Sequence, residues 1–326
     1  MSPDPRDLDQ LRMMTKVSHL YHNRGMVQSE IAKTLGLSQA RVSRLLSAAE
    51  EADIVRTVVV PPEGLNTDLE ERLENDFGLL EVHVVDASGE TEAERTETLG
   101  RALSNVFEIQ PIENKTIGFT SWSRSMRNFV SALSKLPHAK AKAVVEMLGG
   151  VGQPAVQHAA TTATERLAKL TDAEARFLRV PGVVPSIAVK EAILETDPFA
   201  RAALETLGNI DIALIGIGGL HVVPPLVAGD NFFTEEQFEI AAKAGAVGEI
   251  NLRFMDADGN PVITELNDLV VGITLEQLKR AERRIAVSGG ESKHPALLAA
   301  VRGGWINVLV TDEESAEYLL KHGPKK

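Results

Sequence analysis

The chain has 326 residues, no cysteine and a formal net charge of −12 at pH 7, which excludes disulfides and thiolate metal ligands. Its length predicts two domains, and 44% hydrophobic and 25% charged residues are typical of a globular protein with sizeable cores. No apolar run approaches the roughly 18 residues that cross a bilayer, and the polar N-terminus does not resemble a signal peptide, so we expect a cytoplasmic protein without membrane contact.

Residues 28–46, QSEIAKTLGLSQARVSRLL, have the pattern of a helix-turn-helix. Gly36 allows the left-handed backbone of the turn, and Ser38 is placed to cap the second helix. That helix buries Val42 and Leu46 at helical spacing and leaves polar donors exposed. The residues that we expect to contact the phosphates and base edges of double-stranded DNA are Gln28, Ser38, Gln39, Arg41, Ser43 and Arg44.

An ordinary helical hairpin with a solvated charged face is the alternative interpretation. The local charge favours DNA, because residues 10–45 hold six Lys/Arg and one Glu in an otherwise acidic chain. A helix over Leu11–Tyr21 is expected to support the hairpin, and Ile54–Val60 predicts a strand, one arm of a wing. Pro61 and Pro62 interrupt the pattern, so we place the end of a DNA-binding domain at residue 62.

Residues 63–78 predict a linker helix whose apolar stripe packs on the main domain or on a second subunit. From residue 79 to 326, apolar runs alternate with helical patterns, which predicts an α/β domain with a parallel sheet and helices on both faces. The expected strands are Glu81–Val85, Thr116–Phe119, Ala143–Leu148, Ile210–Ile217, Ile285–Ser288 and Asn307–Val310. Gly248–Met255, a turn over Asp256–Gly259 and Pro261–Thr264 predict an inserted hairpin.

Several strands end in glycine or small hydroxyl residues, as in Gly118–Ser121, Gly149–Gly152, Gly216–Gly219 and Ser288–Gly290. Glycine also serves ordinary strand-to-helix turns, so any one loop is weak evidence. Four such loops at the carboxyl ends of one parallel sheet predict a ligand pocket that can accept phosphate. A dinucleotide cofactor is not expected, because His221 stands where the third glycine of that motif belongs.

Three groups of side chains are candidates for ligand contacts. Ser123, Arg124 and Ser125 open a helix after a strand, which suits a phosphate, although Arg124 can instead pair with a surface carboxylate. Lys293 lies in the first turn of a helix, where the helix dipole disfavours a cation unless an anion binds beside it. The alternative is that Lys293 is an ordinary solvated surface lysine. Glu249 begins an apolar strand, where it accepts sugar hydroxyls or only edges the sheet. No metal-binding histidine spacing and no G-x-S-x-G elbow occurs, so neither a metal nor a catalytic residue is expected.

These segments resemble the sorbitol-operon (SorC) family of bacterial transcriptional regulators. The resemblance rests on residues 28–46, on Gly149–Gly152 and Ile215–Gly218, and most strongly on residues 245–256 and 285–312. It implies a helix-turn-helix domain followed by a larger Rossmann-like sensor domain, residues 79–326, similar to sugar-phosphate isomerases and deaminases. It further implies a homotetramer that represses or activates a catabolic operon.

By position, the resemblance implies that Ser123 and Ser125 hold an effector phosphate and that Glu249 and Lys293 contact the ligand. The glycines that it places in the pocket are Gly149, Gly150 and Gly152. The loop TSWSRS at 120–125 departs from the glycine-rich stretch of many relatives, which indicates a different sugar or an unphosphorylated polyol. We therefore expect a DNA-binding regulator of a carbohydrate or polyol operon, controlled by a sugar phosphate or polyol. The alternative, a sugar-phosphate isomerase or deaminase, leaves the hairpin without a role.

Overall fold

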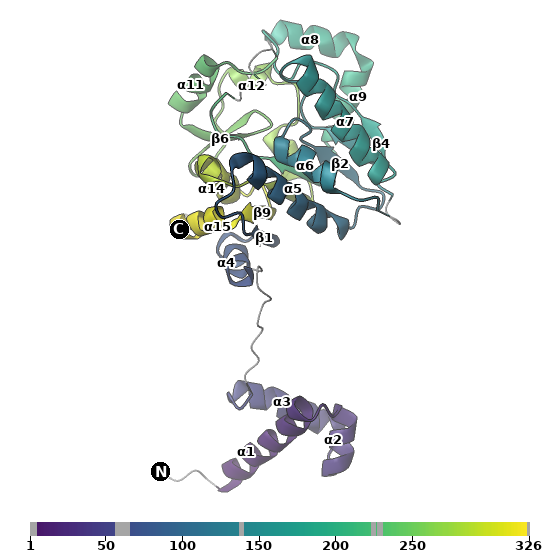
Figure 1. Ribbon diagram of the computed structural model, residues 1–326, viewed down its shortest axis with the longest axis vertical. Helices are drawn as coiled ribbons and strands as arrows, with labels where there is room; N and C mark the ends of the chain where they lie inside the picture. The colour runs from purple at the N-terminus through teal and green to yellow at the C-terminus, as the bar shows by residue number, and fades with distance from the viewer. Residues whose placement is uncertain (1–4, 56–65, 137–139, 223–225, 227–230, 325–326) are drawn as a thin grey trace. The chain divides into compact units, whose positions relative to one another are not determined.

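The computed structural model describes residues 5–55, 66–136, 140–222, 226 and 231–324. The chain divides into two compact units, Met1–Pro61 and Pro62–Lys326. The first unit is helical (Figure 1), and its elements are α1 (Pro5–Ser18), a π-helical turn (His19–Asn23), α2 (Gln28–Leu35) and α3 (Gln39–Glu51). The predicted strand Ile54–Val60 lies largely outside the described residues.

The turn between α2 and α3 has the predicted geometry. Gly36 ends α2 with φ +64°, a conformation that costs glycine little. The Ser38 hydroxyl accepts a hydrogen bond from the backbone N–H of Arg41 at 3.2 Å and so caps α3. Behind the turn, Val42 on α3 packs in a small core with Ile31 on α2.

The second unit is an α/β structure built on a parallel sheet (Figure 1). Its strands are β1 (Glu81–Val85), β2 (Thr116–Phe119), β3 (Ala143–Glu146), β4 (Glu174–Arg176), β5 (Ile212–Gly216), β6 (Ala246–Ile250), β7 (Arg253–Asp256), β8 (Arg283–Val287) and β9 (Val308–Asp312). Its helices are α4 (Thr67–Phe77), α5 (Glu92–Glu108), α6 (Arg124–Ala132), α7 (Pro154–Leu170), α8 (Ile187–Thr196), α9 (Pro198–Leu207), α11 (Glu235–Lys243), α12 (Leu266–Leu269), α13 (Leu275–Lys279), α14 (His294–Arg302) and α15 (Glu313–His322). A 3₁₀ turn, Glu291–Lys293, precedes α14.

Among the described residues, seven strands pair in parallel in the order β1-β9-β8-β5-β2-β3-β4, which confirms the predicted parallel sheet. Apolar side chains cover both of its faces. One face packs against α5, α6 and α7, with Phe107 and Phe129 fully buried. The other packs against α4, α14 and α15, with Leu73 and Leu297 fully buried. The strands read as nearly continuous apolar runs because helices bury the sheet on both sides.

Helix α4, the predicted linker helix, packs on the sheet of the second unit. Its Leu73 belongs to the core. Its Glu74 Oε1 accepts from the backbone N–H of Val82 at 2.9 Å, and its Glu70 Oε1 accepts from that of Val84 at 2.8 Å. Both N–H groups belong to β1, the edge strand. The two carboxylates therefore satisfy donors that an open sheet edge exposes to pairing with another chain.

The segment after α11 corrects part of the predicted hairpin. The sequence predicts a continuous strand over Gly248–Met255, but the chain reverses within it at Asn251 and Leu252, which have φ +50° and +62°. Strands β6 and β7 on either side of this turn form the antiparallel pair. The predicted turn over Asp256–Gly259 is present as a second reversal. The first turn was missed because leucine rarely adopts a positive φ, so an apolar run conceals it.

Candidate functional site

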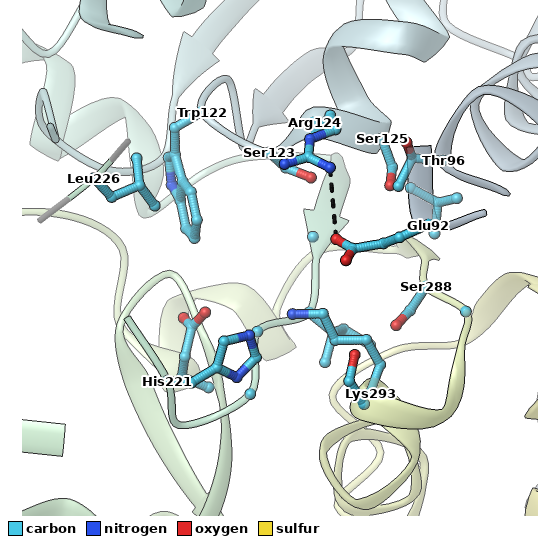
Figure 2. Close-up of a pocket in the computed structure, with 18 of the residues that line it drawn as sticks. Glu92, Thr96, Trp122, Ser123, Arg124, Ser125, His221, Leu226, Ser288 and Lys293 are labelled. Atoms are coloured by element: carbon cyan, nitrogen blue, oxygen red, sulfur yellow. Dashed lines mark ion pairs between the residues drawn. The ribbon is translucent and has the colours of Figure 1, made fainter. Parts of the chain in front are cut away.

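A pocket opens at the carboxyl ends of β2 and β5, where the order of the sheet changes direction. From β2 the chain proceeds through β3 to β4, whereas β5, β8 and β9 lie on the other side of β2. Ligands of open parallel sheets bind at such a switch point, because the loops there diverge and leave a crevice. Residues from loops far apart in the sequence meet in it (Figure 2). Its polar and glycine lining includes Glu92, Thr96, Ser123, Arg124, Ser125, Gly216, Gly218, His221, Glu249, Ser288 and Lys293.

The first wall of the pocket is the start of α6. Ser123 is the residue before the helix, and Arg124 and Ser125 form its first turn, as predicted. Arg124 Nη1 lies 3.5 Å from Glu92 Oε1 on α5, and Figure 2 shows the two side chains facing each other. Arg127, one turn further along, donates from Nη1 to the backbone oxygen of Trp122. Burial lowers the pKa of Arg127, and the nearby positive charge of Arg124 lowers it further.

Glu249 on β6 forms the floor of the pocket. Its side chain is buried, and its Oε2 accepts from the backbone N–H of Leu252 at 2.6 Å. Burial raises the pKa of Glu249 to about 7, against the opposing effects of the Leu252 hydrogen bond and of the positive charge of Lys293. A buried carboxylate with acceptor capacity to spare is suited to bind ligand hydroxyls.

Backbone pairing fixes the place of Glu249. Gly218, in the loop after β5, exchanges backbone hydrogen bonds with Glu249 at 3.0 and 2.9 Å. The buried turn that follows is joined to the loop after β2, because the Thr120 hydroxyl lies 3.2 Å from Asn251 Oδ1 and donates to it. The hairpin β6–β7 is thereby connected to both strands at the switch point, and the carboxylate is carried into the crevice.

Lys293 lies across from Glu249, at the end of the 3₁₀ turn that leads into α14. Burial lowers the pKa of the Lys293 ammonium, while Glu249 and then Glu92 act in the opposite direction. The Ser315 hydroxyl supports this loop, accepting from the backbone N–H of Gly290 at 3.1 Å and lying 3.2 Å from the His294 ring nitrogen Nε2. Hydrogen bonds therefore fix the loop that carries Lys293, and its ammonium group is largely buried rather than freely solvated.

Two further polar atoms of the lining are left without partners. Trp122 Nε1 and Ser288 Oγ are buried and have no hydrogen-bond partner among the described residues. Native proteins rarely leave buried donors unpaired unless a water or ligand completes them. Both residues line the pocket or its rim, so both atoms favour a polar ligand over an apolar one.

The three predicted glycines lie outside this pocket. Gly149 approaches the segment after β4 so closely that a side-chain carbon there would lie 2.5 Å from the backbone oxygen of Val180. Gly150 pairs with Pro181 and lines a neighbouring cavity, which also contains the buried carboxyl of Glu146. Gly152 donates to Asn231 Oδ1 at 2.7 Å. Close backbone packing accounts for Gly149, and a φ of +74° accounts for Gly152. Ser123, Arg124, Ser125, Glu249 and Lys293 line one pocket.

Sequence reasoning missed the contribution of α5 and of His221. Glu92 and Thr96 reach the pocket from the first turns of α5, and no motif in the sequence marks them. His221 follows the glycine loop after β5, and burial lowers the pKa of its ring, with Lys293 adding to that effect.

Within the described residues no group of three or more His, Cys, Asp or Glu side chains is arranged to hold a metal ion, and no helix is long and apolar enough to cross a membrane.

Comparisons with known proteins place the chain in a family. A family model described as "Putative sugar-binding domain" matches residues 62–321. The chain is 29% identical over 317 residues to the sorbitol operon regulator of Klebsiella pneumoniae, covering 96% of this chain and 99% of that protein. It is 30% identical over 318 residues to the deoxyribonucleoside regulator of Bacillus subtilis, with the same coverage.

The fold agrees with this relationship. The crystal structure of the full-length sorbitol operon regulator SorC of Klebsiella pneumoniae matches with a TM-score of 0.72 at 27% identity, over 96% of this chain and 99% of that one. The chain therefore belongs to the SorC family of sugar-binding-domain transcriptional regulators. The relatives named above are transcriptional regulators and not enzymes, which confirms the predicted class of protein and favours it over the isomerase alternative.

Proposed function

We propose that this regulator binds operator DNA through its first unit and a sugar-derived effector in the pocket between β2 and β5. One observation carries the effector assignment. Arg124 and Lys293, two cations, share a pocket with the buried carboxylate of Glu249. The cations suit an anionic group, and the carboxylate suits hydroxyls, so the pocket is complementary to a ligand that has both.

The anionic group fits best at the start of α6. The unpaired N–H groups of a helix N-terminus attract a phosphate, and the hydroxyls of Ser123 and Ser125 add donors there. Arg124 is otherwise poorly placed, because a cation at a helix N-terminus opposes the helix dipole. These features favour a phosphorylated sugar over a free polyol.

The DNA assignment rests on α2, Gly36 and α3. Gln39, Arg41, Ser43 and Arg44 are exposed on α3, while Val42 faces the core. This places one polar face of α3 toward solvent, as reading a major groove requires. Ser38 caps the helix and Gln28 begins α2, so both stand where a phosphate can approach the backbone.

We propose the corresponding domain organisation. Residues 1–62 bind DNA, residues 63–78 connect the domains, and residues 79–326 bind the effector and form the oligomer. The homotetramer and a role as a repressor stay predictions from the family resemblance, and the cytoplasmic location stays a prediction from the composition of the sequence. Effector control then requires that the ligand favours one arrangement of the subunits and that this arrangement binds DNA with a different affinity. A change in DNA affinity by a factor of about 10 to 100 corresponds to roughly 1–3 kcal/mol of coupling free energy.

The experiment is a thermal-shift screen of the full-length chain against phosphorylated sugars, the matching free sugars and polyols. A ligand at 100 times its Kd stabilises the folded state by about 2.7 kcal/mol, or several degrees for a domain of this size. We expect phosphorylated compounds to raise the melting temperature of wild type and of Lys243→Gln, an exposed control on α11. Lys293→Gln should abolish this thermal shift. Shifts only with free polyols, or shifts insensitive to Lys293→Gln, would remove the proposed anion site.

A further inference from the structure

The Glu92–Arg124 pair crosses the proposed anion site. Glu92 Oε1 and Arg124 Nη1 lie 3.5 Å apart, and their side chains are 80% and 48% exposed. Each is the first residue of its helix, Glu92 of α5 and Arg124 of α6. Figure 2 shows Arg124 on one side of the Glu92 carboxylate and Lys293 on the other. The protein's own carboxylate thus meets the guanidinium that an effector phosphate would bind.

Among the described residues, the Glu92 side chain pairs with Arg124 and has no other hydrogen bond or ion pair. Thr91 and Glu94 cap α5 together: the Thr91 hydroxyl accepts from the backbone N–H of Glu94, and Glu94 Oε2 accepts from the backbone N–H of Thr91 at 2.9 Å. The α5 dipole favours a carboxylate at Glu92, but any exposed acid in that turn gains as much. An ion pair with so much exposure contributes little to stability, so Glu92 can turn into water when another anion takes Arg124.

The charge of Glu92 also extends to the opposite wall. The Glu92 carboxylate acts to raise the pKa of both Lys293 and His221. Burial has the larger effect, so the pKa of each is lowered overall. An incoming anion therefore meets Arg124 and Lys293, whose positive charges are partly neutralised by Glu92 and Glu249. A bare phosphate binds only at the proposed anion site, whereas a sugar phosphate also places hydroxyls on Glu249.

From this arrangement we infer that Glu92 sets the affinity of the anion site: its carboxylate competes with the effector's anionic group for Arg124. The competition weakens the binding of every anion at Arg124, so that only a ligand with further contacts, such as hydroxyls on Glu249, binds tightly. This inference rests on the proposed effector site and adds to it the means by which simple anions are rejected.

The test measures the Kd of inorganic phosphate for the full-length chain by calorimetry at fixed low ionic strength, where screening is weakest. Glu92→Gln removes the charge at nearly the same shape, Glu92→Ala is a second variant, and Glu97→Gln removes an exposed charge from the same helix outside the pocket. We expect both Glu92 variants to bind phosphate about fivefold more tightly than wild type, the effect of losing a competing exposed pair. Glu97→Gln should bind it as wild type does.

An Arg124→Gln variant separates the two possible failures. Equal Kd values in wild type and the Glu92 variants, with weaker binding in Arg124→Gln, would overturn the role of Glu92 and keep the anion site. Phosphate binding that is absent throughout, or that is unchanged in Arg124→Gln and in both Glu92 variants, would overturn the role of Glu92 together with the anion site at α6.

Discussion

The loop glycine Gly218 and the pocket carboxylate Glu249 lie so close together that a side chain at position 218 would have to displace the carboxylate. A side-chain carbon on Gly218 would lie 1.7 Å from Glu249 Oε1. The same two residues are paired through their backbones. The glycine loop after β5 is therefore glycine because it must make room for a buried carboxylate, in addition to any approach of a ligand.

Gly218→Ala should displace the Glu249 carboxylate or the loop that carries it. We expect a loss of about 1–3 kcal/mol in the free energy of unfolding, as for other overpacked sites, and loss of the effector-induced thermal shift. Gly208→Ala is the control, because a carbon there meets its nearest neighbour at an ordinary 3.4 Å. A Gly218→Ala protein that responds to effector like wild type would show that Glu249 does not contact the ligand.

The protonation of Glu249 should make stability depend on pH. Its pKa is raised to about 7 in the folded protein, from an ordinary value of 4.5, so between these pH values the folded protein holds a proton that the unfolded chain has released. The stabilisation is complete below about pH 4.5 and is lost as the pH rises through 7, by up to about 1.4 kcal/mol per pH unit.

Denaturant unfolding of wild type and Glu249→Gln at pH 5 and pH 8 measures this dependence. The amide does not titrate, so the free energy of unfolding of wild type minus that of the variant should decrease between pH 5 and pH 8. A difference that stays constant over this range would mean that Glu249 titrates normally.

The carboxylate of Glu74 should stabilise the edge of the sheet. Glu74→Ala leaves the Val82 N–H without its acceptor, and hydrogen bonds to charged groups contribute about 1.5–3 kcal/mol. Glu71→Ala, an exposed residue of the same helix, should change the free energy of unfolding by less than about 0.5 kcal/mol. Equal midpoints of urea unfolding for the two variants would rule out this role for α4.

Arg44 should contribute to DNA affinity through a phosphate. In the structure its exposed side chain donates only locally, from Nε to the backbone oxygen of Ala40 at 3.3 Å. Arg44→Ala should weaken binding to all sequences and reduce the slope of log affinity against log salt by about 1. Lys321→Ala, which removes an exposed charge from the second unit, should leave that slope unchanged. If the slope of Arg44→Ala also matches wild type, Arg44 holds no phosphate.

Periodicity predicted what depends on local pattern: the parallel sheet, the turn at Gly36 and the opening of α6 at Ser123. It missed β4, which is only 3 residues long, and α8, whose apolar residues form no clear stripe. It also missed α9. The site was predicted where a residue's chemistry was conspicuous on its own, as at Lys293. Glu92 was missed because an exposed acid in a first helical turn is common, and only the fold brings it to Arg124.

Control of DNA binding by the pocket can be measured as the coupling between effector and DNA. DNA selected for binding by the full-length chain is titrated by fluorescence anisotropy with and without the phosphorylated sugar that gives the largest thermal shift. Wild type should change its DNA Kd by roughly tenfold or more on addition of effector. Lys293→Gln should bind the same DNA with wild-type affinity and show no effector response. A wild-type DNA Kd that saturating effector leaves unchanged would contradict the account.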